Sequence, residues 1–189
     1  MNKIAFITGA SSGIGKATAL KLSNDGYDLI LCGRRAEKLE ELSNSLKTKT
    51  YSLLFDVRDR EVVQKCIIAL PEEWKNISVL INNAGNAHGL DPIQSGNTED
   101  WDAMLDINVK GLLYVSKAVI TGMTERKSGH IINIGSSAGK EVYPKGNVYC
   151  ASKHAVLAIT EGMRIDLNPF GIKVSAINPG LVETEFSKV

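Results

Sequence analysis

Tyr149 and Lys153 have the residue types and the spacing of an acid–base pair. The segment around them has the apolar periodicity of a helix, in which residues four apart stand on one face. A free phenol has a pKa of about 10, and a nearby ammonium favours the phenolate and lowers that value. The pair therefore predicts general acid/base chemistry at a substrate oxygen. The spacing is common, so a helix with an incidental tyrosine and lysine is the alternative.

A second candidate group follows the apolar run Ile131–Ile134, where Ser136 and Ser137 stand next to each other. A serine at the carboxyl end of a strand in an open α/β sheet faces the ligand crevice. Either serine could therefore orient a substrate. The alternative is a loop serine that makes an ordinary turn hydrogen bond.

Asn108 lies inside an apolar stripe of the helix-like stretch Thr98–Met123. An amide buried in such a stripe needs hydrogen-bond partners, so Asn108 is a candidate site residue. A purely structural buried asparagine is the alternative. The stripe consists of Trp101, Leu105, Leu112, Val115 and Val119.

A glycine-rich loop, Thr8–Gly15, joins the first apolar run to a helix-like stretch. Glycines let the backbone turn sharply and approach a ligand closely, and the N-terminus of the following helix favours a pyrophosphate. The position between a first strand and a first helix favours a dinucleotide site over a plain turn. The candidate cofactor contacts here are Thr8, Gly9, Ser11, Ser12, Gly13, Ile14 and Gly15.

The second apolar run ends in Gly33, Arg34 and Arg35. In NAD-selective folds an acidic residue at this place accepts from the ribose 2′-hydroxyl; here a glycine replaces it. A guanidinium suits a 2′-phosphate in charge and in geometry. The segment therefore predicts NADP(H), with Arg34 the better candidate and Arg35 the second. Two solvated arginines ahead of a helix are the alternative.

The elements that must position these residues are short apolar runs in alternation with helix-like stretches. Such repetition predicts an α/β fold, with a doubly wound Rossmann-type parallel sheet and helices on both faces, in one domain over residues 1–189. The runs are Ile4–Thr8, Leu29–Cys32, Tyr51–Phe55, Val79–Ile81, Ile131–Ile134 and Val174–Ile177. The helix-like stretches are Ile14–Ser23, Ala36–Leu46, Arg60–Leu70, Thr98–Met123 and Tyr149–Leu167.

The composition argues against several other classes of protein. A net charge of +1 gives no reason to expect nucleic acid or a membrane as partner. No apolar run approaches the ~18 residues of a membrane span, and no signal peptide precedes the first run. Three widely spaced cysteines fit reduced thiols in the cytoplasm. The histidines His88, His130 and His154 lack metal-ligand spacing, so we assign no metal.

The motif Thr8-Gly-x-x-x-Gly-Ile-Gly resembles that of the short-chain dehydrogenase/reductase family, and six of the family's motifs occur here in family order. The resemblance implies a Rossmann-type oxidoreductase that moves a hydride between a nicotinamide and an alcohol or carbonyl. Tyr149 and Lys153 would be catalytic and would also contact the cofactor. Ser136, rather than Ser137, would orient the substrate, and Asn108 would hold a water in a proton relay.

The resemblance also implies further cofactor contacts. Asp56 and Val57 would clamp the adenine ring, although Asp56 could instead cap the next helix, a role for which Asp59 competes. The tetrapeptide Asn82–Gly85 would lie beside the ribose, with Asn82, Ala84 and Gly85 as contacts. The segment after the sixth run would meet the nicotinamide carboxamide through Pro179, Gly180, Val182 and Thr184.

Within the family, the chain is similar to the NADP-dependent 3-hydroxy acid dehydrogenases, which act on serine and L-allo-threonine. A small 3-hydroxy acid is therefore the expected substrate, and Lys140 or Lys145 could meet its carboxylate. A 3-oxoacyl carrier-protein reductase or a broad carbonyl reductase would share the catalytic residues. A non-catalytic cofactor-binding protein is the third possibility, but it would not need Ser136, Tyr149 and Lys153 together.

Two expectations concern assembly and length. The stretches Thr98–Met123 and Tyr149–Leu167 carry wide apolar surfaces, the second through Ala155, Val156, Ile159 and Met163. They predict a homodimer or a homotetramer. Family members continue with a further strand and helices after the position of Phe186, so we expect this C-terminus to be truncated and the lid of the family to be absent.

Overall fold

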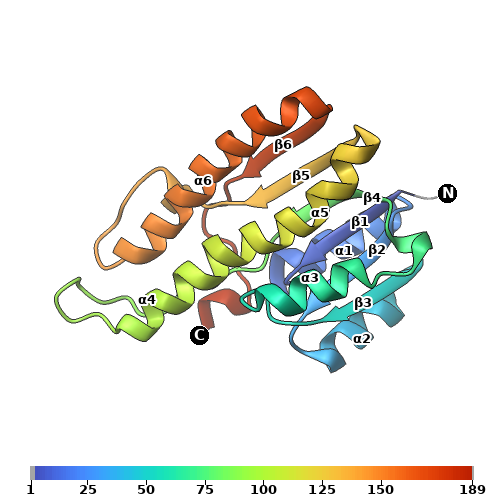
Figure 1. Ribbon diagram of the computed structural model, residues 1–189. Helices are drawn as coiled ribbons and strands as arrows, with labels where there is room; N and C mark the ends of the chain where they lie inside the picture. Colours follow the sequence, from blue (N-terminus) through green and yellow to red (C-terminus); the bar gives the residue numbers. More distant parts are fainter. Residues whose placement is uncertain (1–2, 189) are drawn as a thin grey trace.

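The computed structural model describes residues 3–188, and its strands form one parallel sheet in the order β3-β2-β1-β4-β5-β6 (Figure 1). The chain winds outward from β1 to β3, crosses back, and continues from β4 to β6, so the predicted doubly wound fold is confirmed. The direction reverses between β1 and β4, where ligands bind beyond the carboxyl ends of the strands. The strands are β1 Ile4–Thr8, β2 Asp28–Gly33, β3 Thr50–Leu54, β4 Ile77–Asn82, β5 Gly129–Ile134 and β6 Ile172–Ile177.

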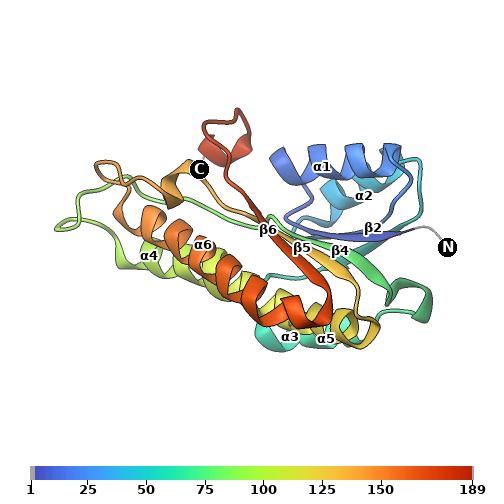
Figure 2. The same cartoon turned by 90° about the horizontal axis from the view of Figure 1, so that it is seen from above.

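Helices cover both faces of the sheet, and Figure 2 shows α1 and α2 on one face and α3, α5 and α6 on the other. Along β1 the side chains alternate between two cores: Phe6 packs with the α3 and α5 side, Ala5 and Ile7 with the α1 and α2 side. A strand buried on both faces must be apolar throughout, as β1 is. The helices are α1 Gly13–Asn24, α2 Ala36–Ser45, α3 Arg60–Ile68, α4 Thr98–Leu105, α5 Leu112–Arg126 and α6 Asn147–Leu167.

The predicted helical stretch Thr98–Met123 is confirmed, but it is not one regular α-helix, because a π-helical segment, Asp106–Gly111, joins α4 to α5. A π-helical turn holds more residues than an α-helical turn, so it shifts the faces of the helix on either side. Leu105 accordingly leaves the apolar stripe and is 39% exposed, whereas Asn108 within the π segment is 2% exposed. Within residues 3–188 no helix is long and apolar enough to cross a bilayer.

Candidate active site

Tyr149 and Lys153 lie on the first turns of α6, on the same face of the helix. The Lys153 side chain is buried, and its Nζ atom lies 5.9 Å from the centre of the Tyr149 ring. The ammonium donates a hydrogen bond of 3.0 Å to the carbonyl oxygen of Ile134 at the end of β5. The helix thus brings a phenol and an ammonium to the carboxyl edge of the sheet.

Burial controls the charge of both groups. It lowers the pKa of Lys153 to about 8. It also raises the pKa of Tyr149, against a hydrogen bond with Ser136 that lowers it, and the nearby Cys150 thiol raises it further. The expected lowering of the phenol pKa by Lys153 is wrong for this arrangement, because burial raises the pKa of Tyr149 and the group that lowers it is Ser136.

Ser136 and Ser137 differ clearly in position. Ser136 hydrogen-bonds with Tyr149, and its Oγ atom also accepts from the backbone N–H of Ala138 at 3.1 Å. The side chain of Ser137 is exposed. The structure therefore brings Ser136, not Ser137, to the phenol, and the ordinary turn bond and the contact with Tyr149 coexist at one hydroxyl.

Asn108 joins the loop after β4 to α6. Its Nδ2 atom donates to the carbonyl oxygen of Asn86 at 2.9 Å and to Oγ of Ser152 at 3.0 Å, while its Oδ1 atom accepts from the N–H of Asn86 at 2.9 Å. These bonds satisfy the buried amide, and the bond to Ser152 places it next to the residue that precedes Lys153. A Cβ atom on Gly85 would lie 3.1 Å from Asn108 Oδ1 and 3.7 Å from Lys153 Nζ, so glycine there keeps the approach open. All of these contacts are with protein atoms and suit a structural role, and the relay through a water at Asn108 stays a prediction.

The glycine-rich loop folds tightly over the start of α1. Gly9 and Gly13 adopt positive φ angles of 64° and 51°, where side chains are strained, and a Cβ atom on Gly15 would collide with the carbonyl oxygen of Gly9. Ser12 is the N-cap residue of α1 but makes no side-chain capping bond, and the first turn of α1 holds no acidic residue. The cradle and the uncapped helix start suit the pyrophosphate of a dinucleotide.

Asn83 anchors this loop, a role that the sequence analysis did not assign. Its Nδ2 atom donates to the carbonyl oxygens of Thr8 and Gly9 at 3.0 Å each, while Thr8 Oγ1 accepts from the N–H groups of Asn83 and Ala84. The side chain of Asn82 instead donates to Ser116 Oγ at 2.8 Å and to Asn133 Oδ1 at 2.9 Å. Asn83 is half-buried next to buried Asn82, and the need of a side-chain amide away from water for hydrogen-bond partners is the signal that could have identified it.

Asp56 follows β3 and lies between two arginines. Its Oδ2 atom is 2.8 Å from Nη2 of Arg58 and 3.5 Å from Nη1 of Arg34. Burial raises the pKa of this carboxyl, but the hydrogen bonds and charge of Arg58 outweigh burial and hold the pKa below its ordinary value. Asp59 is the N-cap of α3, since it accepts from the N–H groups of the first turn. The capping alternative for Asp56 is therefore excluded. Val57 is buried against Gly111 of the π segment.

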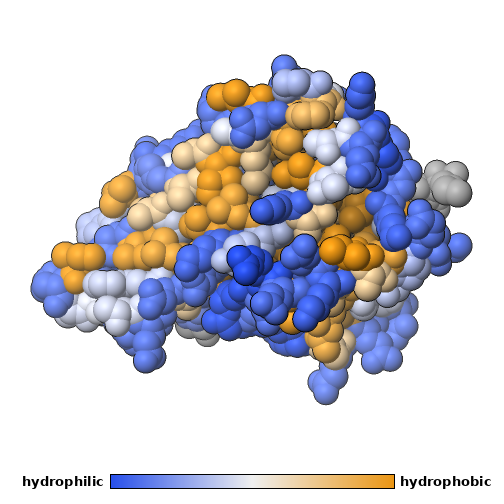
Figure 3. All heavy atoms as spheres, in the orientation of Figure 1, coloured by the Kyte–Doolittle hydropathy of each residue, from blue (hydrophilic) through white to orange (hydrophobic). Residues whose placement is uncertain are grey.

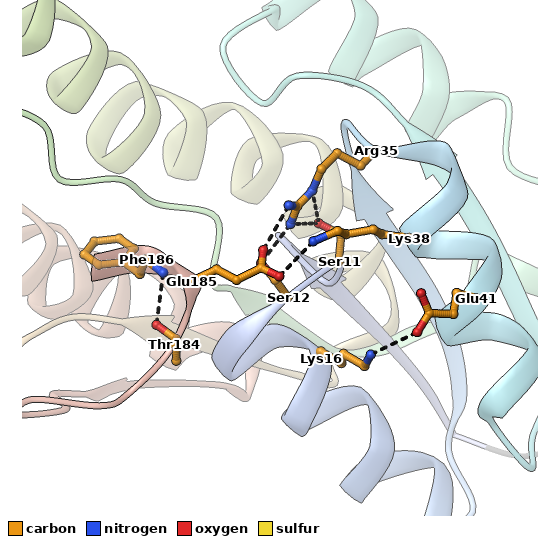
Figure 4. A network of polar contacts seen from close by, with 9 residues as sticks. All are labelled: Ser11, Ser12, Lys16, Arg35, Lys38, Glu41, Thr184, Glu185 and Phe186. Carbon is orange, nitrogen blue, oxygen red and sulfur yellow. Dashed lines mark hydrogen bonds and ion pairs between the residues drawn. The ribbon is translucent and has the colours of Figure 1, made fainter. Parts of the chain in front are cut away.

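Arg35, rather than Arg34, reaches the glycine-rich loop (Figure 4). Its Nη2 atom donates to Ser11 Oγ at 3.0 Å and to Ser12 Oγ at 2.9 Å, and its Nη1 atom lies 3.0 Å from a carboxylate oxygen of Glu185. Lys38 holds the other oxygen of Glu185 at 2.8 Å. Lys38 was not among the residues predicted from the sequence, although it lies one helical turn after Arg35, where side chains share a face.

The segment after β6 returns to the same edge. The N–H of Ser137 donates to the carbonyl oxygen of Pro179 at 2.9 Å, and a Cβ atom on Gly13 would lie 3.2 Å from Thr184 Cβ. Gly180 and Val182 are exposed. The ring of Phe186 lies 6.2 Å from that of Tyr149, measured between centroids. The segment therefore spans the glycine-rich loop and the phenol.

The profile of the short chain dehydrogenase family matches residues 3–189. The chain belongs to this family. The resemblance inferred from its motifs is confirmed over nearly the whole sequence, and a short chain dehydrogenase is an oxidoreductase that acts on hydroxyl groups. The pair of Tyr149 and Lys153, with Ser136 beside it, therefore lies in a dehydrogenase scaffold.

Two similar proteins and one solved structure place this short chain dehydrogenase more narrowly. The NADP-dependent 3-hydroxy acid dehydrogenase YdfG of Shigella flexneri is 44% identical over 187 residues, which cover 98% of this chain and 75% of the relative. Sulfoacetaldehyde reductase 2 of Chromohalobacter salexigens is 42% identical over 192 residues, which cover 100% of this chain and 76% of the relative. The closed form of serine dehydrogenase complexed with NADP+ superposes with a TM-score of 0.95 at 44% identity, covering 98% of this chain and 75% of that one.

Proposed function

We propose that this protein transfers a hydride between NADP(H) and a small 3-hydroxy acid, or its 3-oxo counterpart. The observation that carries the proposal is the pairing of buried Lys153 with Tyr149, which hydrogen-bonds Ser136 just after the carboxyl end of β5. The similar dehydrogenases that use NADP and act on 3-hydroxy acids or serine support the choice of cofactor and substrate.

The residues divide the chemistry among them. The nicotinamide cofactor, when bound, gives or takes the hydride at the substrate carbon. The hydroxyls of Ser136 and Tyr149 hold the substrate oxygen, and Tyr149 donates its proton during reduction or accepts one during oxidation. Lys153 provides positive charge behind the phenol, and Asn108 fixes the backbone of Asn86 beside it. Proton return through a water near Asn108 is part of the proposal.

The residues present fit the proposed cofactor. The glycine-rich loop from Thr8 to Gly15 would hold the pyrophosphate, Arg34 and Arg35 would meet the 2′-phosphate, and Asp56 with Val57 would flank the adenine. Thr184 lies against Gly13 of the loop, and the segment that carries it would hold the nicotinamide end through Pro179, Gly180, Val182 and Thr184.

The carboxylate of the substrate should decide its selection. Lys140 and Lys145 are exposed on the loop between Ser136 and Tyr149, and either could pair with it. A charged hydrogen bond contributes about 1.5–3 kcal/mol, so we expect kcat/KM for 3-hydroxybutyrate to exceed that for 2-butanol by roughly 10- to 100-fold at saturating NADP+. Initial rates of NADPH formation measure both.

The alternative functions predict different outcomes when the same rates are measured for a wider panel of substrates. Equal kcat/KM for the acid and the neutral alcohol would indicate a broad carbonyl reductase. Preference for an oxoacyl thioester would indicate a 3-oxoacyl carrier-protein reductase, and preference for sulfoacetaldehyde a sulfonate-directed reductase like the relative of that name. No turnover of any of them, with NADP+ bound, would indicate a non-catalytic cofactor-binding protein.

We also propose that the protein is a homodimer or homotetramer in the cytoplasm. Figure 3 shows apolar side chains gathered over α5 and α6, where Leu113 is 38% and Ile165 68% exposed. Val156, expected on this surface, is instead buried, and Met163 packs partly against the core, while Ala155 and Ile159 are half-buried. We expect light scattering at micromolar concentration to give two or four times the chain mass, and a monomer would contradict the assembly.

The proposed location in the cytoplasm is supported by the three cysteines, which are free thiols.

A further inference from the structure

Two cations, Arg35 and Lys38, bind the carboxylate of Glu185, and two serines of the glycine-rich loop, Ser11 and Ser12, bind the guanidinium of Arg35. We call Ser11, Ser12, Arg35 and Lys38 the anion cluster. It holds Glu185 through bonds of 3.0 Å from Arg35 and 2.8 Å from Lys38, and Arg35 is itself held by the two serine hydroxyls (Figure 4). A cavity of about 210 Å³ adjoins it, lined by Ser11, Ser12, Gly13, Lys16, Lys38, Glu41 and Glu185.

The cluster is built for more negative charge than it holds. Hydrogen bonds from Lys38 and then Arg35 lower the pKa of Glu185 to about 2, so the side chain is an anion throughout the physiological range. Two cations face one carboxylate, which offers two oxygens and a single charge. A phosphate monoester offers three oxygens and a charge near −2 at pH 7, and therefore matches this set of donors better.

The contact with Glu185 is easily broken. The side chains of Arg35, Lys38 and Glu185 are 45%, 40% and 51% exposed, and exposed ion pairs are weak because water screens them. Glu185 also lies after β6, in a segment that is 150 positions from Arg35 in the sequence. A ligand with higher charge that enters beside the glycine-rich loop can replace it.

We infer that Lys38 is a further specificity-determining residue for the 2′-phosphate of NADP(H), and that Glu185 occupies the anion cluster as an internal competitor until the cofactor displaces it. This inference rests on the proposed function. It moves the main recognition from Arg34, which lies beside Asp56, to Arg35 and Lys38.

Displacement of Glu185 would also affect the contact between Phe186 and the catalytic Tyr149. Thr184 packs on Gly13, Glu185 sits in the cluster, and Phe186 contacts the ring of Tyr149. Because these residues are consecutive, release of the carboxylate loosens a segment that touches both the pyrophosphate loop and the phenol. Binding of the 2′-phosphate is thereby linked to the position of this segment.

The first test is Lys38→Gln, with Kd measured by calorimetry for NADP+, NAD+, 2′,5′-ADP and 5′-AMP. Loss of a charged partner should raise the Kd of the two 2′-phosphorylated ligands about 10- to 100-fold and leave NAD+ and 5′-AMP unchanged. If wild-type protein prefers NADP+ and Lys38→Gln keeps that preference in full, the inference is wrong and the proposed function stands. If wild-type protein binds NAD+ as tightly as NADP+, the cofactor of the proposed function is wrong.

The second test is Glu185→Gln, which removes the competing charge. We expect the Kd of NADP+ and 2′,5′-ADP to fall about 2- to 10-fold, that of 5′-AMP to stay the same, and the gain to shrink at 1 M salt. Glu183→Gln is the matched control, because it removes a carboxylate of the same segment outside the cluster. Unchanged or weaker binding of 2′,5′-ADP by Glu185→Gln would overturn the role of internal competitor.

Discussion

Tyr149→Phe will lower kcat at least ~100-fold and leave the Kd for NADPH nearly unchanged. The phenol that bonds Ser136 is the proposed proton donor, and loss of general acid catalysis costs about 10²- to 10⁴-fold. Phenylalanine keeps the ring, so the contact with Phe186 at 6.2 Å and the packing of α6 are preserved. Single-turnover oxidation of NADPH, together with a binding titration, measures the two effects separately.

Tyr143→Phe is the matched control, because this second tyrosine lies before the same helix and burial also raises its pKa. We expect the control to keep most of the wild-type activity. A Tyr149→Phe variant that retains more than half of the wild-type kcat would show that another group supplies the proton.

Lys153→Met will lower kcat by a similar factor and yet raise the free energy of unfolding at pH 7. Burial lowers the pKa of Lys153 from 10.5 to about 8, which corresponds to a cost of about 3 kcal/mol for the charged form in the folded state. Below pH 8 the amine is charged in both the folded and the unfolded chain, so that cost is fully present. Methionine has a similar shape and carries no charge, so it avoids the cost.

The gain should disappear with rising pH. Between pH 8 and 10.5 the unfolded wild-type chain binds more protons at Lys153 than the folded chain does, so the free energy of unfolding of the wild type rises with pH. The advantage of Lys153→Met is therefore full at pH 7 and lost by about pH 10.5. Urea denaturation at pH 7 and at pH 10 measures the difference between the two proteins.

Lys117→Met on the exposed side of α5 serves as the control, and we expect no comparable gain from it. If Lys153→Met is less stable than the wild type at pH 7, the hydrogen bond to Ile134 contributes more than burial costs. A stable but inactive Lys153→Met protein would instead show that the enzyme retains a destabilising lysine for its chemistry.

Local chemistry explains what could be predicted from the sequence alone. Strand β1 was predicted with its observed bounds because Ile4–Thr8 is a short apolar run directly followed by a glycine. The common face of Tyr149 and Lys153 depends only on helical periodicity. The doubly wound topology follows from alternating strands and helices joined by right-handed crossovers, and the motifs identified the family.

Tertiary structure decided the features that depend on residues far apart in the chain. Asp56 and Asp59 were equal candidates for the cap of α3 until their positions assigned the cap to Asp59 and left Asp56 to the arginines. The π segment, which moves Leu105 outward and Asn108 inward, leaves no mark in the spacing of apolar residues.

The pKa values and ion pairs of the site show most clearly which features depend on the tertiary structure. The pKa values of Tyr149 and Lys153 depend on burial, which the neighbours of α6 determine. The contact of Lys38 with Glu185 joins residues 147 positions apart. Residue types and local periodicity determine which groups are available and which backbone elements carry them. Desolvation and charge pairing act through space, so only the folded chain determines which groups meet and how strongly they hold their protons.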